Sequence, residues 1–394
     1  MAEIIRFTGD LVQTSNTYKD AVAYAGKLYT VDTGPRWIKY DLATLTTDIG
    51  ATATGSTPVG ISIISSASSV VCLNNTTVDI FENSSGFRSN ISGGTAAIAL
   101  TKGQTIAGNP VSKIAFYCSN TSGTIVKVNG NTFACSTFTP AGLSGTTALS
   151  VCTLDNNWIF GTANGKLVEV DSAGAEVRVT TLPTTPNVGT APTLRVCGLS
   201  YYNDKLLVQT NFGTQLLYTY SASSVDWKNI TGACTTSTNG NTLCESSSGL
   251  VVYSNYFSQS TPSAINVADF SGDPPVVLDS LLCGDRVTDV VASGIDSTTN
   301  RGFVVYNTTA VRTFNLIPSN RVTVQTRYLD PPTVDVSYDI LRLRRNKKGR
   351  ATFDSLTQDI TPGQSNIAAS QGNDYWELGT LTDDSEYDFR TFLT

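Results

Sequence analysis

The sequence predicts an all-β protein that consists of a seven-bladed β-propeller in residues 1–320 and a β-rich C-terminal extension in residues 321–394. Three observations predict this organisation. One pattern of strands and turns recurs seven times, the composition favours strands over helices, and both the repeat and the composition change near residue 320.

Each copy of the repeat contains a short apolar strand, a tight polar turn and a second alternating strand. The copies begin at large apolar residues separated by 42 to 52 residues: Leu28, Val70, Phe116, Trp158, Leu206, Val251 and Phe303. One four-stranded propeller blade has a similar length, about 40–50 residues. The spacing therefore predicts seven blades between residues 28 and 316.

Further apolar runs precede several of these positions, at residues 20–25, 59–65, 148–154 and 194–202, and we expect them to be the innermost strands. Residues 3–13 precede the first full repeat and alternate in the manner of a strand. Because a closed ring removes exposed sheet edges, we expect this N-terminal strand to pair with the last blade.

The composition excludes several classes of protein. Ser and Thr make up about a quarter of the chain, which favours short strands and turns. A net charge of −6 and a pI near 4.8 argue against a nucleic-acid-binding protein. The chain contains no run of 18 apolar residues, so we predict no membrane span. Its first residues do not resemble a secretory signal, so we expect synthesis in a cytoplasm.

Catalytic and metal-binding patterns are scarce. The chain has no His, which excludes Ser-His-Asp and Cys-His catalysis and Cys/His zinc sites. The Asp-containing stretches at 269–273 and 296–300 do not complete a calcium loop, and ordinary turns explain them better. A glycosidase with two converging carboxylates stays open. We predict no catalytic residue, no metal and no cofactor. Cys234 and Cys244 could pair across a hairpin, although reduced cysteines are the default expectation.

Four tryptophans suggest a different kind of site. Trp158 opens a repeat strand and is expected in the core, whereas Trp37 and Trp227 follow polar turn sequences and are candidates for an exposed ligand-binding surface. Exposed aromatic side chains can stack on a glycan or anchor a protein interface, so the residue type alone does not choose between the two.

The C-terminal extension has a distinct composition, because charged residues rise from about 12% of the chain before residue 321 to about 27% after it. We predict that residues 321–394 dock onto a neighbouring subunit by strand addition. The candidate partner-binding residues are six basic residues and two aromatic ones: Arg342, Arg344, Arg345, Lys347, Lys348, Arg350, Tyr375 and Trp376.

Low charge, abundant Ser, Thr, Gly and Asn, a divergent propeller repeat and a charged tail together resemble the virion structural proteins of tailed bacteriophages. Propeller modules occur there in tail nozzles, hubs, baseplates and fibre-associated proteins. The resemblance covers residues 3–320, at the level of composition and repeat period. It implies a non-enzymatic assembly protein of the virion that contacts tail or baseplate subunits and further copies of itself. A host-receptor or glycan-binding propeller is the alternative, and a glycoside hydrolase is a third hypothesis.

Overall fold

The protein is all-β, as the sequence predicts, and its described residues contain one short 3₁₀ helix, Ala141–Leu143. The computed structural model describes residues 3–11, 16–44, 46–51, 55–98, 105–182 and 194–202, and after residue 202 mainly the strands. Side chains are described for most of residues 16–201 and for parts of 206–315. No helix in the described part is long and apolar enough to cross a membrane.

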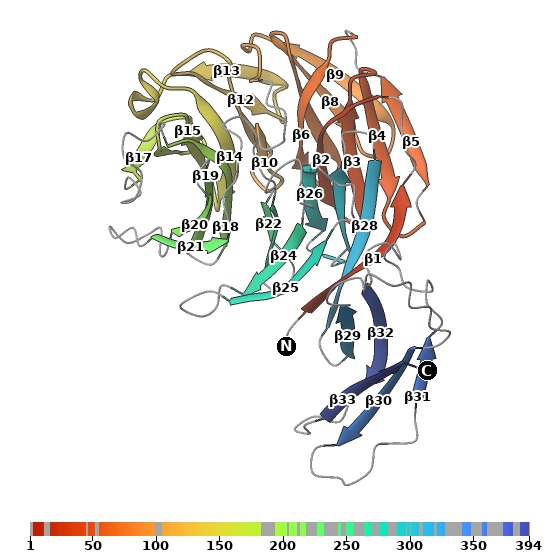
Figure 1. The fold of residues 1–394 in the computed structure, drawn as a ribbon. Helices are drawn as coiled ribbons and strands as arrows, with labels where there is room; N and C mark the ends of the chain where they lie inside the picture. The colour runs from red at the N-terminus through yellow and green to blue at the C-terminus, as the bar shows by residue number, and fades with distance from the viewer. Residues whose placement is uncertain are drawn as a thin grey trace.

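The described strands form seven four-stranded antiparallel sheets, which Figure 1 shows grouped side by side. In sequence order, these sheets are β2 (Tyr18–Tyr24), β3 (Lys27–Asp32), β4 (Arg36–Asp41) and β5 (Thr47–Ala51); β6 (Pro58–Ser65), β7 (Ser68–Leu73), β8 (Thr77–Glu82) and β9 (Gly86–Ser92); β10 (Ile106–Asn109), β11 (Ile114–Cys118), β12 (Ile125–Asn129) and β13 (Ala134–Phe138); β14 (Ala148–Leu154), β15 (Asn157–Thr162), β16 (Lys166–Val170) and β17 (Glu176–Thr181); β18 (Val196–Tyr202), β19 (Lys205–Thr210), β20 (Gly213–Leu217) and β21 (Trp227–Thr231); β22 (Leu243–Glu245), β23 (Leu250–Asn255), β24 (Ala264–Asp269) and β25 (Val276–Leu282); and β26 (Val290–Asp296), β27 (Arg301–Tyr306) and β28 (Ala310–Pro318) with β1 (Glu3–Leu11).

Each of the seven repeat positions found in the sequence lies in the second strand of one of these sheets. Leu28 is in β3, Trp158 is in β15 and Phe303 is in β27, and the other four follow the same rule. The first strands also contact one another in chain order, from β2 through β6, β10, β14, β18 and β22 to β26, and β26 contacts β2. The contacts between neighbouring sheets therefore form a closed cycle.

The N-terminal strand completes the last sheet. β1 pairs antiparallel with β28, from Glu3 opposite Pro318 to Leu11 opposite Val311. The register shifts between Phe7 and Gly9, which leaves Thr8 at a β-bulge. The expectation that residues 3–13 pair with the last repeat is confirmed for Glu3–Leu11.

The hydrophobic core lies between neighbouring sheets rather than in one central mass. One cluster joins the first sheet, through Trp37 and Tyr29, to Ile61, Val71 and Phe81 of the second. Another joins the third sheet to the fourth around Phe116 and Trp158. Because each apolar sheet face is covered by the next sheet, the core depends on the sheets staying in contact.

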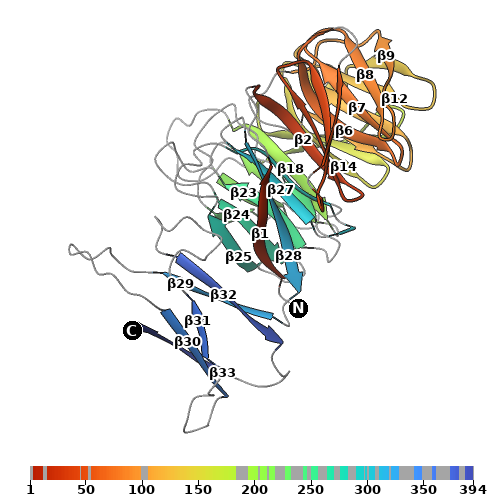
Figure 2. The ribbon, with the colours of Figure 1, turned by 90° about the vertical axis from the view of Figure 1, so that its right-hand side faces the viewer.

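Five strands follow β28 and form two further sheets. They are β29 (Arg321–Arg327), β30 (Leu341–Lys347), β31 (Thr357–Ile360), β32 (Asn373–Thr380) and β33 (Tyr387–Leu393). β29 pairs with β32, and β30 lies between β31 and β33. Figures 1 and 2 both show these strands beyond the end of β28, apart from the four-stranded sheets.

Candidate functional site

The C-terminal basic residues lie on the central strand of the three-stranded sheet. Arg342, Arg344, Arg345 and Lys347 are in β30, whereas Lys348 and Arg350 lie outside the described residues. Tyr375 and Trp376 are in β32, which pairs with β29 in the other C-terminal sheet. The structure therefore places the basic and the aromatic candidates in two different sheets.

The register of β30 divides its basic residues between two faces. Successive residues of a strand alternate between faces, so Arg342 and Arg344 share one face while Arg345 and Lys347 share the other. Arg344 is opposite Arg390 of β33. Two like charges in directly opposite positions are unfavourable unless an anion lies near them. On the same face, Arg342 is opposite Asp359 of β31, so this face carries both signs of charge and the register does not select a docking face.

Trp37 does not lie at a surface, and its interpretation as an exposed ligand-binding residue is wrong. It is 2% exposed, its ring stacks on Phe81 of the next sheet at 5.1 Å, and its indole N–H donates to the Ser69 hydroxyl at 3.0 Å. The polar turn before it ends at Pro35, and β4 begins at Arg36 and places Trp37 between two sheets.

The other tryptophans fall in separate places. Trp158 is fully buried, as expected, and donates to the Ala107 carbonyl at 3.0 Å. Trp227 begins β21, where it is opposite Leu217, and its side chain lies outside the described part. Because Trp37 is on β4 of the first sheet and Trp227 is on β21 of the fifth, the two candidates belong to different sheets.

Several buried carboxylates are held by structural contacts. Asp32 pairs with Arg36 at 2.5 Å. Glu169 accepts from Asn157 at 2.7 Å and pairs with Arg178 at 3.2 Å, and Asp79 accepts from Asn90 at 2.6 Å. Buried charges need such partners to offset their lost hydration. Each of these carboxylates links neighbouring parts of one sheet.

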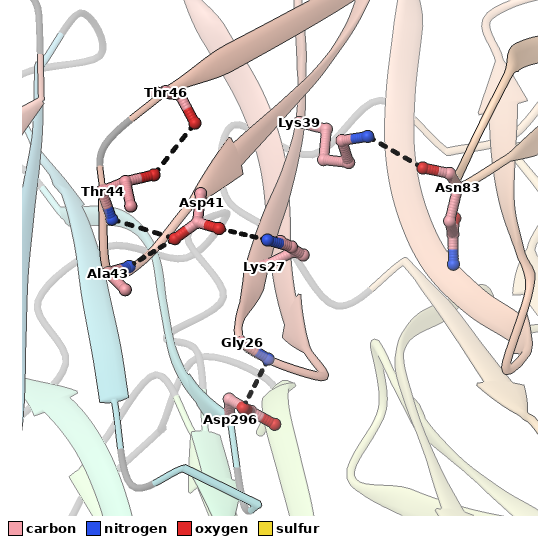
Figure 3. A network of polar contacts seen from close by, with 9 residues as sticks. All are labelled: Gly26, Lys27, Lys39, Asp41, Ala43, Thr44, Thr46, Asn83 and Asp296. Atoms are coloured by element: carbon pink, nitrogen blue, oxygen red, sulfur yellow. Dashed lines mark hydrogen bonds and ion pairs between the residues drawn. The ribbon is translucent and has the colours of Figure 1, made fainter.

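A network of polar contacts joins the last sheet to the first, and Figure 3 shows it from close by. Asp296, at the end of β26, accepts from the backbone N–H groups of Ala25 and Gly26 at 3.1 and 2.7 Å. Ala25 and Gly26 both have positive φ, +50° and +74°, because they form the tight turn between β2 and β3. The Asp296 carboxylate thus fixes the first hairpin from the neighbouring sheet.

The same network contains an ion pair within the first sheet. The Lys27 ammonium contacts the Asp41 carboxylate, which also accepts from the N–H groups of Ala43 and Thr44 at 2.7 and 2.9 Å. The bond from Lys27, followed by these two backbone bonds, holds the pKa of Asp41 well below its usual range. This pair is partly exposed, so solvent screens it and it adds little to stability.

We expect Asp296→Ala to destabilise the protein by roughly 1–3 kcal/mol, because it leaves three backbone N–H groups and the Thr299 hydroxyl without their acceptor. Asp296→Asn keeps one acceptor oxygen and should lose less. Urea unfolding followed by circular dichroism measures both. Asp41→Ala is the matched control, since it also removes a carboxylate that caps turn N–H groups but at a more exposed place. Equal losses for Asp296→Ala and Asp41→Ala would contradict the assigned role of Asp296 between the sheets.

The described residues give no sign of a metal centre, since no group of three potential ligands occurs among them. Cys72, Cys118, Cys135, Cys152 and Cys197 are free thiols. Burial raises the pKa of the Cys135 thiol to about 11, which keeps it neutral near pH 7. Cys244 lies on β22 and Cys234 lies outside the described part, so their pairing stays an open prediction.

Sequence reasoning singled out none of the buried acidic residues Asp20, Asp32, Asp79 and Glu169. Asp20 begins the apolar run at 20–25, which we interpreted as an innermost strand, and its charge did not enter that interpretation. The structure buries its carboxyl group between the first two sheets, at 4% exposure. The available signal was an Asp at the start of an otherwise apolar strand.

Comparison of the chain with protein-family models and with curated protein sequences gives no match.

Proposed function

We propose that the chain is a seven-bladed β-propeller with a C-terminal docking segment, and that it serves as a non-enzymatic structural protein of a bacteriophage virion. The observation that carries the proposal is the regular placement of one sequence repeat in each four-stranded sheet, with β1 completing the last one. A ring of packed sheets is a rigid scaffold, and its function lies in its surfaces.

The contacts of the buried carboxylates support a structural role. Asp32, Glu169 and Asp296 each bind arginine, amide or backbone groups that hold strands or sheets together. A catalytic carboxylate needs access to a substrate, and these three are buried among their partners. The glycan-binding alternative loses one of its two aromatic candidates with the burial of Trp37.

In this proposal, residues 321–394 attach the propeller to tail or baseplate subunits, or to further copies of the chain, within the virion. β31 and β33 are the edges of their sheet among the described strands, and an edge can accept a strand from a partner. The basic residues of β30 supply positive charge for an acidic partner. The chain is synthesised in the host cytoplasm and becomes part of the particle.

The test is incorporation into particles. Mass spectrometry of purified virions should detect the full-length chain in a constant ratio to the other structural proteins. A chain that ends at residue 320 should accumulate in the infected cell yet be absent from particles, because it lacks the docking strands. The full-length variant Arg342→Gln/Arg344→Gln, compared with Arg345→Gln/Lys347→Gln on the opposite face, identifies the face that docks.

Two results would contradict the proposal in different ways. Absence of the full-length chain from purified particles would exclude a virion role. Normal incorporation of the chain that ends at residue 320 would leave the virion role in place and exclude docking through the C-terminal strands. Hydrolysis of a glycan by the purified full-length protein would instead favour the hydrolase hypothesis.

A further inference from the structure

Asp20 links the first sheet to the second through its carboxyl group. It lies in β2, where the register with β3 shifts between Tyr18 and Asp20. One carboxyl oxygen, Oδ1, accepts from the N–H of Ala21 at 2.8 Å. The other, Oδ2, accepts from the N–H of Ile61 in β6 at 2.9 Å. The carboxyl group therefore bridges the first strands of two neighbouring sheets.

Two comparable bridges between the first strands of other sheets use neutral hydroxyl groups, whereas the Asp296 carboxylate bridges the last sheet to the turn after β2. The Ser62 hydroxyl of β6 accepts from the N–H of Gly108 in β10 at 2.9 Å. Ser150 of β14 donates to the Val196 carbonyl of β18 at 3.1 Å. The register shifts of other first strands place small neutral residues where β2 has Asp20: Gly60, Ser150, Gly198 and Ala292. Among the described first strands that have such a register shift, β2 is the one with an acidic residue directly after it.

Among the described residues, no cation forms an ion pair with Asp20. Asp32, at the end of the neighbouring strand β3, pairs with Arg36. Cys72 of β7 is a titratable neighbour of Asp20. Burial, and after it the Asp20 carboxyl group, raises the pKa of the Cys72 thiol, so this thiol stays neutral. Lys19 precedes Asp20 on β2, and Asp296 of β26 contacts the other end of β2, at Ala25 and Gly26.

We propose that the protonation state of Asp20 controls how firmly the first sheet is held to the second, so that this junction strengthens on acidification and weakens as the pH rises toward neutrality. A buried carboxylate without a cation is unfavourable, whereas the neutral acid keeps oxygen acceptors for both N–H groups at a lower cost of burial. The carboxyl group thus acts as a pH-responsive contact between β2 and β6.

Burial supports this direction, because it raises the pKa of Asp20 from 3.8 to about 7 against the opposing effect of the two backbone bonds. A folded-state pKa above the unfolded value means that the stabilising contribution is complete below pH 3.8. It is lost as the pH rises from 3.8 to about 7, and changes little above that. The chain has no His, so no histidine obscures this window.

The first experiment compares unfolding by urea at several pH values between 5 and 8. In the unmodified full chain, the equilibrium constant for unfolding should rise with pH by up to about tenfold per unit below pH 7, as expected for one linked proton. Asp20→Asn loses one hydrogen bond at every pH, so it should be less stable at pH 5 but should lose this pH dependence. Ser62→Ala removes a neutral bridge and should keep the pH dependence of the unmodified chain. Equal pH dependence in Asp20→Asn and the unmodified chain would overturn the proposal.

A second measurement needs no variant. Amide hydrogen exchange followed by mass spectrometry reports on the peptides that contain Ile61 and Gly108, whose N–H groups bind Asp20 and Ser62 respectively. Relative to the Gly108 peptide, which corrects for the intrinsic effect of pH on exchange, the Ile61 peptide should lose protection between pH 5 and 8. A constant ratio of the two exchange rates would also overturn the proposal, even if Asp20→Asn failed to fold.

Discussion

A chain that lacks residues 1–13 is expected to lose most of its stability and to aggregate. The deletion removes β1, whose register with β28 contains eight residue pairs, and it leaves β28 as an exposed edge. A backbone hydrogen bond contributes about 1 kcal/mol net, so the loss is comparable with the 5–15 kcal/mol of a typical domain. Thermal unfolding and size-exclusion chromatography with light scattering measure the two effects.

A complementation control distinguishes loss of β1 from a general effect of truncation. A synthetic peptide of residues 1–13, added during refolding, should pair with β28 and restore the monomeric elution volume and part of the thermal stability. Two point variants offer a second control. Thr8 lies at the bulge of β1 and Ile5 lies at a paired position, so Thr8→Pro should destabilise the protein less than Ile5→Pro. A truncated chain that remains monomeric with an unchanged unfolding temperature would refute the importance of this strand.

Trp37→Ala is expected to destabilise the protein by roughly 3–5 kcal/mol, the usual cost of removing a buried tryptophan. The substitution opens a cavity between the first two sheets and removes the stack on Phe81. It also leaves the Ser69 hydroxyl without its donor. Urea unfolding measures the loss.

Matched variants identify the cause. Trp37→Phe keeps an aromatic ring and should lose less, whereas Ser69→Ala leaves a buried indole N–H unpaired, at a cost of about 1–3 kcal/mol. Phe87→Ala is a suitable surface control, because Phe87 also contacts Phe81 but is 43% exposed, and it should cost less than about 1 kcal/mol. If Trp37→Ala cost no more than Phe87→Ala, the assignment of Trp37 to the core would fail.

The features that local sequence could predict are those that repeat along the chain. The period of the apolar runs located the second strand of each sheet, and the alternation of residues 3–13 identified β1 as a strand. Its pairing with β28 followed from the need to close an edge, which is a property of sheets in general. The candidate basic residues of β30 were evident as a charge run.

The features that local sequence could not predict depend on contacts between strands and sheets. Trp37 follows a polar turn and looks exposed in the sequence, yet its environment is set by Phe81 and Ser69, more than 30 residues away. Asp20 looked like the start of an apolar strand, and its acceptor role follows from the position of Ile61 in the next sheet. The position of Arg344 opposite Arg390 required the register of β30 with β33.

The pairing of β1 with β28 also sets an order for folding during synthesis. β1 leaves the ribosome roughly 300 residues before its partner, which at about 5–20 residues per second is an interval of about 15–60 seconds. During this time the strand has no native partner, and contacts so distant in sequence form slowly. Arg6 and Asp10 lie on either side of Phe7 in β1. Such charges interrupt an apolar strand and hinder its pairing with another nascent chain before β28 arrives.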